Sequence, residues 1–186
     1  MNGWPLFLSS VRYAINEGID PIVSTDSPKI IDICKSMEIK YFKEKVDDSN
    51  MFNCIKQVIE SLDEKPSMFA LLQPTSPMRQ KGLLRKMISD VPVDGSFHSC
   101  FTVQNLKCIG FLDGKFQVAY RDQDTSRRFF HFDGNILLCN TKWVMKNKKL
   151  FDDDSTIYEN PFPYYLQIDT ESEYNVMNMI SKNLLF

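Results

Sequence analysis

The feature that most constrains the fold is an apolar run that is closed by two prolines. The run, Met68–Leu72, is typical of a buried strand. It must end before Pro74, because proline has no N–H to donate to a sheet ladder, and Pro77 stiffens the loop that follows. A helical segment is predicted from about Lys81. The chain therefore contains a strand that ends in a rigid polar loop and leads into a helix.

The polar side chains of this loop are candidates for ligand binding. In parallel α/β sheets, ligands bind in the crevice beyond the carboxyl ends of the strands. The loop offers amide, hydroxyl and guanidinium groups at such a place, from Gln73, Thr75, Ser76 and Arg79. The alternative is a proline-rich connector whose polar residues only satisfy backbone groups. The residues of the loop leave both interpretations open.

Helical and strand-like segments alternate strictly up to this loop. Ser27-Pro28, for example, is a helix start, with a hydroxyl cap followed by proline at the first helical position. Such alternation is typical of βαβ units and of a parallel, doubly wound sheet. The predicted helices are 6–17, 28–37 and one that is capped by Asp47–Ser49 and reaches 62, and the predicted strands are 21–25, 39–42 and 68–72.

The second half of the chain changes character. Ile109–Val118 is a predicted hairpin with an Asp-Gly turn, and Thr170–Glu173 has the capping-box pattern that opens a helix. Further strands are predicted at 96–104, 134–139 and 164–168, with a short helix at 141–146. We therefore expect a single α/β domain over residues 1–186, with three layers, a mostly parallel sheet and a hairpin-bearing insertion at about 97–133.

Charge and cysteine content argue against several classes of protein. The formal net charge is -2, from 22 basic and 24 acidic residues, which disfavours general nucleic-acid binding. No run is long enough to span a membrane, and the N-terminus lacks the pattern of a secretory leader. The five cysteines are odd in number and form no CxxC pair, so free thiols in the cytoplasm are expected.

Histidine is scarce, because the chain contains only His98 and His131. A histidine-based metal site or catalytic triad is therefore not expected. His98 falls within an apolar, strand-like segment, where a hydrogen-bonded core histidine is the expected interpretation rather than a ligand.

The run LLQPTSPMR, residues 71–79, closely resembles the LLQPTSPLR signature of the CMP-sialic acid synthetases, or acylneuraminate cytidylyltransferases. The resemblance extends from Met1-Asn2-Gly3 to Ile168-Asp169-Thr170-Glu171. It implies a nucleotidyltransferase-like (Rossmann-like) fold and the transfer of CMP from CTP to an acidic nonulosonate-type sugar. It also implies Mg²⁺ as cofactor and a homodimer that is built on the hairpin insertion.

The resemblance also nominates site residues. Transfer of a nucleotidyl group needs a metal ion and cations to stabilise the charge that develops on the phosphates. Asp169 matches a magnesium ligand of the family, and Arg79 and Lys107 match groups that are expected at the reacting centre. The implied substrate-binding residues are Gln73, Thr75, Ser76, Lys43, Arg127 and Arg128.

The sequence departs from the family at three places. Gln167 replaces the partner aspartate of Asp169, which weakens the expected magnesium site because one carboxylate is lost. His131-Phe132-Asp133-Gly134 stands where the family has Arg-x-Asn-Gly, and imidazole lacks the bidentate fork with which arginine binds a carboxylate. The sequence also does not contain the N-terminal strand and triphosphate-binding loop of the family.

These departures support a second hypothesis. Without the loop that holds the triphosphate, we expect little or no CMP-sugar synthesis from this chain alone. The alternative to an active cytidylyltransferase is therefore a non-catalytic relative that binds a nucleotide or sugar and serves as a dimerisation partner.

Overall fold

The structure is a computed structural model that describes residues 4–45, 50–92, 94–106, 108–112, 115–119 and 129–183. For residues 108–112, 115–119, 129, 182 and 183 it describes the backbone alone. Its elements, in chain order, are α1 (Phe7–Asn16), β1 (Val23–Thr25), α2 (Pro28–Ser36), β2 (Tyr41–Lys43), α3 (Met51–Ser61), β3 (Met68–Leu71), α4 (Leu83–Asp90), β4 (Ser99–Leu106), β5 (Cys108–Leu112), β6 (Lys115–Ala119), β7 (Phe129–Asn140), α5 (Thr141–Asn147), β8 (Thr156–Glu159) and α6 (Glu171–Asn183). Within these described ranges, no helix is both long and apolar enough to cross a lipid bilayer.

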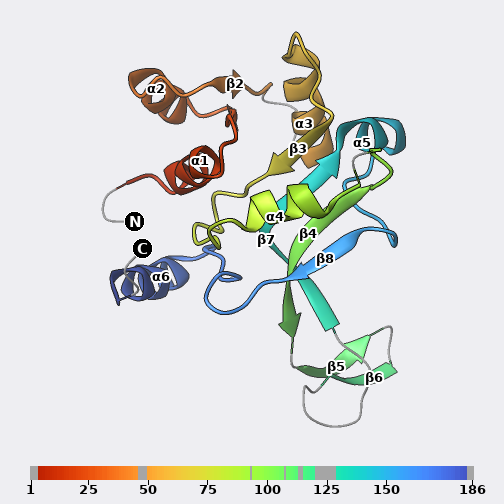
Figure 1. Ribbon diagram of the computed structural model, residues 1–186. Coiled ribbons are helices and arrows are strands. Elements are labelled where there is room, and N and C mark those ends of the chain that lie inside the picture. The colour runs from red at the N-terminus through yellow and green to blue at the C-terminus, as the bar shows by residue number, and fades with distance from the viewer. Residues whose placement is uncertain are drawn as a thin grey trace.

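The central sheet has four strands in the order β3-β7-β4-β8. β7 runs antiparallel to both β3 and β4, and β8 runs parallel to β4, so three of the four strands point the same way. β1 and β2 form a separate parallel pair, and no ladder in the described part of the chain joins that pair to β3. In Figure 1, α2 and β2 lie above α1, with β2 between α2 and α3. The mixed α/β architecture with a parallel-rich sheet confirms the predicted fold class.

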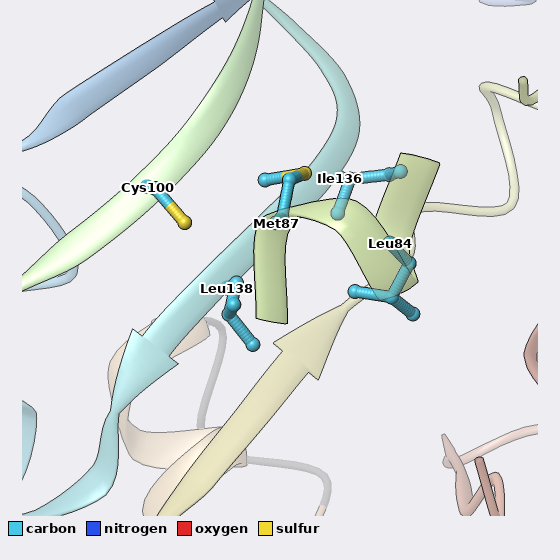
Figure 2. Close-up of a cluster of buried hydrophobic side chains, with 5 residues drawn as sticks. All are labelled: Leu84, Met87, Cys100, Ile136 and Leu138. Carbon is cyan, nitrogen blue, oxygen red and sulfur yellow. The ribbon is translucent and has the colours of Figure 1, made fainter. Parts of the chain in front are cut away.

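The buried strand β7 supplies both apolar layers, because successive side chains of a strand point to opposite faces. On one face, Ile136 and Leu138 pack with Leu84 and Met87 of α4 and with Cys100 of β4 (Figure 2). On the other face lies a second cluster, to which β7, α5, β3 and α3 contribute Leu137, Cys139, Val144, Phe69, Leu71 and Phe52. The sheet is therefore covered on both faces, as expected for three layers.

Helix α1 caps the start of α4. The Glu17 carboxylate, which is only 3% exposed, accepts the backbone N–H groups of Gly82 at 2.7 Å and Arg85 at 3.2 Å. The Tyr13 hydroxyl accepts the Leu84 N–H at 3.1 Å and donates to the Gln80 carbonyl at 2.9 Å. Since Gly82 has no side chain to cap the helix, these contacts from α1 satisfy N–H groups that would otherwise have no partner.

The prediction of a last strand at 164–168 is wrong. These residues form turns, in which the Tyr164 N–H donates to Pro161 O and the Leu166 N–H donates to Pro163 O. The apolar side chains pack against α6 without joining a ladder, and the strand at this side of the sheet is β8. The apolar residues of this segment are buried or partly buried, but Pro161 and Pro163, which come just before it, favour turns over a sheet ladder.

Two other boundaries differ from the sequence-based expectation. The cap of α3 is Asn50, whose side chain accepts the Phe52 N–H at 2.9 Å; the predicted cap residues 47–49 lie outside the described residues. The range expected for the insertion, 97–133, contains β4, which is a sheet strand paired with β7 and β8. The separate unit is the antiparallel β5–β6 hairpin, which projects away from the body of the molecule (Figure 1).

Candidate functional site

A large bulge in β7 lies at the centre of the candidate site. Phe101 pairs with Leu137 and Val103 pairs with Phe132, so a single residue of β4, Thr102, stands opposite four residues of β7, 133–136. Bulges of this kind re-aim side chains and are common next to active sites.

A buried hydrogen-bond network stabilises this bulge. The Thr102 hydroxyl donates to Asp133 Oδ1 at 2.5 Å and accepts the Ile136 N–H at 3.0 Å. Asp133 also accepts the Asn135 N–H at 3.0 Å and the Asn160 side-chain amide at 2.9 Å. Because Asp133 is 1% exposed and receives three donors from the protein, its carboxylate is part of the scaffold.

The proline-containing loop after β3 is fastened onto the same bulge. The Ser76 hydroxyl, which is completely buried, donates to Asp133 O at 3.1 Å. The Arg79 guanidinium donates to Asn135 O at 3.0 Å, to Gln73 O at 2.7 Å and to the Ser10 hydroxyl at 3.0 Å. For Ser76 and Arg79, the polar groups therefore satisfy protein groups, as the second interpretation of this loop expected.

Burial also changes the acidity of the Arg79 side chain. Removal of the guanidinium from water lowers its pKa to about 10, while the nearby Tyr13 and Asp133 act in the opposite direction. The guanidinium remains a cation at neutral pH. It lies 5.7 Å from the centre of the Tyr13 ring, which adds a cation–π contact to its hydrogen bonds.

Gly134 allows two amide side chains to meet over the bulge. Its φ is +66°, and a Cβ at this position would lie 2.3 Å from Gln73 Oε1 and 2.9 Å from Gln167 Nε2. Glycine is required both by the left-handed backbone and by this close approach. Gln73 and Gln167, which are 94 residues apart in the sequence, thus converge on one glycine.

Asp169 lies beside this convergence point. The Ile168 N–H donates to Thr75 O at 2.8 Å, which joins the segment before α6 to the proline loop. The Asp169 side chain is exposed, and its backbone N–H donates to Glu173 Oε2 at 2.8 Å. Glu173 and Thr170 exchange the reciprocal bonds of a capping box, as predicted. These donors lower the pKa of Glu173, chiefly through the bond from Asp169.

The remaining nominated residues are dispersed or not described. Lys43 is exposed at the end of β2, in the two-stranded sheet. Lys107, Arg127 and Arg128 lie outside the described residues. His131, on β7, is exposed and lies two residues before the bulge.

Sequence reasoning missed a cavity of about 440 Å³ at the carboxyl ends of β4 and β8. It is lined by Gln104, Asn105, Leu106, Glu159, Asn160, Pro161, Phe162 and Tyr165. Asn160 connects this cavity to the scaffold, because its side chain accepts from Gln80 at 2.8 Å and donates to Asp133. No motif marks these residues, although their position beyond the strand ends agrees with the usual location of ligand sites.

Similar folds are found among enzymes that act on CTP. At 12% identity and a TM-score of 0.72, the chain resembles CMP:2-keto-3-deoxy-manno-octonic acid synthetase complexed with CTP, over 98% of this chain and 90% of that one. For 4-diphosphocytidyl-2C-methyl-D-erythritol synthase from Anaerococcus prevotii the identity is 14% and the TM-score 0.68, over 95% and 88% of the two chains. For CTP:phosphocholine cytidylyltransferase from Streptococcus pneumoniae the values are 13% and 0.56, over 97% and 86%.

At these identities the likeness establishes the fold, which is nucleotidyltransferase-like. No family model matches the sequence, and no curated protein matches it. The particular reaction therefore has to be argued from the site.

Proposed function

We propose that this chain is a cytidylyltransferase that transfers CMP from CTP to an acidic nonulosonate-type sugar. The observation that carries the proposal is the convergence of nominated residues beyond the carboxyl end of β3. Gln73 meets Gln167 over Gly134, and Thr75 is joined to the residue before Asp169. The similar folds of CTP-dependent cytidylyltransferases support the choice of nucleotide.

On the nucleotide side, Asp169 is the proposed ligand of Mg²⁺. Its carboxylate is exposed at the start of α6, so it is free to bind an ion. Mg²⁺ keeps most of its ligands as water and phosphate oxygens and commonly takes only one or two carboxylates from the protein, so this single carboxylate fits such a role. When bound, the ion would neutralise charge that develops on the phosphates of CTP.

Beside this carboxylate, the nominated residues with surface left for a ligand are Gln73 and Thr75, which are both half-buried. Gln73 is the residue whose side chain reaches Gly134. We assign Gln73 and Thr75 to substrate binding. Lys43 remains a further candidate for the nucleotide.

Ser76 and Arg79 act in this proposal as positioning residues. Both bind the backbone of the bulge, so they hold the loop of Gln73 and Thr75 against β7. A rigid loop matters because nucleotidyl transfer depends mainly on holding the reacting groups in line. Their nominated direct roles, in catalysis for Arg79 and in binding for Ser76, stay predictions.

On the acceptor side, the cavity beyond β4 and β8 is the proposed position of the sugar. It presents amide groups from Gln104 and Asn105, together with the aromatic rings of Phe162 and Tyr165. Amides bind hydroxyl groups and aromatic faces bind apolar C–H faces, which suits a polyhydroxylated ligand. Recognition of the acidic group is assigned to Lys107, Arg127 and Arg128.

The decisive test separates nucleotide binding from turnover. Calorimetric titration of CTP with Mg²⁺ should show saturable binding that Asp169→Asn weakens, with Asp153→Asn as the charge-matched control on another exposed loop. Pyrophosphate release should then depend on an added nonulosonic acid. Failure of CTP to bind would overturn the proposal.

Binding without turnover is the expected behaviour of the second candidate, the non-catalytic nucleotide- or sugar-binding relative. The observation in its favour is that the Arg79 guanidinium is buried and donates three hydrogen bonds to protein groups. Sugar-dependent pyrophosphate release would exclude this alternative.

A further inference from the structure

A second cluster of chemically active side chains lies at the amino ends of β4 and β8, where these two strands begin. His98 directly precedes β4, and Asp152 and Asp154 precede β8. The 440 Å³ cavity lies at the carboxyl ends of these strands, and the bulge of the candidate site lies opposite Thr102 of β4. At about 3.3 Å per residue, the far end of β4 is roughly 25 Å from the cluster, and Thr102 is roughly 13 Å from it along the strand. The cluster shares no residue with the proposed nucleotide site.

His98 is hydrogen-bonded, as its apolar context predicted, but it lies at the margin of the core. Its side chain is 28% exposed, as is that of Asp152. The Nδ1 atom lies 3.0 and 3.1 Å from the two carboxylate oxygens of Asp152. The ring is stacked on Trp143 of α5, with centroids 4.6 Å apart and an angle of 16° between the planes. The imidazole is thus held by packing with one nitrogen turned toward a carboxylate.

Asp152 is fixed as firmly as His98. Its backbone N–H donates to the Ser155 hydroxyl at 2.9 Å, and Ser155 lies 2.9 Å from the Ser99 hydroxyl of β4. The Asp154 backbone N–H donates to Asp152 Oδ1 at 3.2 Å. Its own carboxylate is exposed and free to change rotamer.

We propose that His98, Asp152 and Asp154 form a binding site for a divalent transition-metal ion of the Zn²⁺ type. One ligand atom from each residue lies within 4.8 Å of the others. Zn²⁺ bonds of about 2.0–2.2 Å place tetrahedral ligand atoms about 3.3–3.5 Å apart. His98 and Asp152 are already close to that spacing, and rotation of the exposed Asp154 side chain completes the set.

The donor atoms select the metal. An imidazole nitrogen with two carboxylates suits Zn²⁺ or Co²⁺, whereas Mg²⁺ prefers oxygen ligands alone. Three protein ligands leave a fourth position for water. An ion here would fasten the connection between α5 and β8 to the start of β4. The site would thus join segments that lie more than 50 residues apart in the sequence.

The test measures Zn²⁺ binding by calorimetry in an Asp169→Asn background, which removes the proposed magnesium ligand from the comparison. Asp154→Asn should weaken Zn²⁺ binding by at least about tenfold, since the loss of even an indirect partner of a metal ligand weakens binding 10–100-fold. Asp153→Asn is the matched control, because it removes the same charge from an adjacent exposed residue. It should bind Zn²⁺ like the parent, and excess Mg²⁺ should not compete.

Two spectroscopic measurements identify the ligands. The chain has two histidines, so ¹⁵N imidazole spectra with a His131→Gln variant assign His98, whose Nδ1 resonance should shift on addition of Zn²⁺. Co²⁺ should give weak visible bands without the intense near-ultraviolet absorption of thiolate ligation. Equal weakening by Asp153→Asn and Asp154→Asn, an unchanged Nδ1 resonance, or an absence of Zn²⁺ binding would each overturn the proposal. Loss of CTP binding in Asp169→Asn alone bears only on the proposed enzyme activity.

Discussion

Replacement of Asp133 tests whether the bulge of β7 is held by its buried carboxylate. Three donors point at this side chain: the Thr102 hydroxyl, the Asn135 N–H and the Asn160 amide. In Asp133→Ala, the Thr102 hydroxyl can turn to Ile136 O, which is 3.3 Å away. The donors of Asn135 and Asn160 are left without this acceptor inside the protein.

The magnitude follows from these two donors. Each unsatisfied buried donor costs about 1–3 kcal/mol, so Asp133→Ala should lower the free energy of unfolding by roughly 2–6 kcal/mol. Asp133→Asn should cost much less. Its carbonyl oxygen can still accept from Thr102 and Asn135, and the amides of Asn160 and Gln80 can reverse in turn to accept the new N–H. We expect about 1 kcal/mol for that change.

Urea denaturation followed by circular dichroism measures both variants, with Asp153→Ala as the exposed control, which should stay within about 0.5 kcal/mol of the wild type. In a chain of this length the alanine variant should also melt roughly 4–24 °C lower, at about 2–4 °C per kcal/mol. An Asp133→Ala variant as stable as the control, or equal losses in the alanine and asparagine variants, would refute the assigned network.

Three further predictions concern packing, pH and assembly. Glu17→Ala removes the acceptor of two N–H groups at the start of α4 and should cost about 2–4 kcal/mol in urea denaturation, whereas the exposed Glu38→Ala should not. Burial raises the pKa of Tyr13 to about 12, so the stability that depends on its neutral hydroxyl is complete below pH 10 and is lost as the pH rises from 10 through 12. Tyr13→Phe should reduce the loss of stability over that interval, and an unchanged alkaline transition would contradict this assignment. We also predict that the β5–β6 hairpin builds a homodimer, and light scattering that shows only monomer at micromolar concentration would count against it.

Much of the local structure was determined by the sequence itself. The alternation of apolar runs and helix starts predicted the α/β class, because helix and strand periodicities depend on neighbouring residues. The Thr170–Glu173 capping box formed as expected, and so did a hairpin around the Asp-Gly turn, although the turn residues themselves lie outside the described residues. The loop after Met68–Leu71 was also located correctly, because proline cannot donate to a ladder.

The use of the polar residues was decided only by the tertiary structure. The family resemblance nominated Ser76 and Arg79 as site residues, and only the tertiary structure shows that carbonyl oxygens of the bulge at 133–136 accept hydrogen bonds from both side chains. That bulge has no signature in the sequence, since it depends on the register between β4 and β7. The pairing of His98 with Asp152 was likewise invisible. In each case the partner is more than 50 residues away, and a long-range hydrogen bond is specified by the packing of elements rather than by the pattern within one of them.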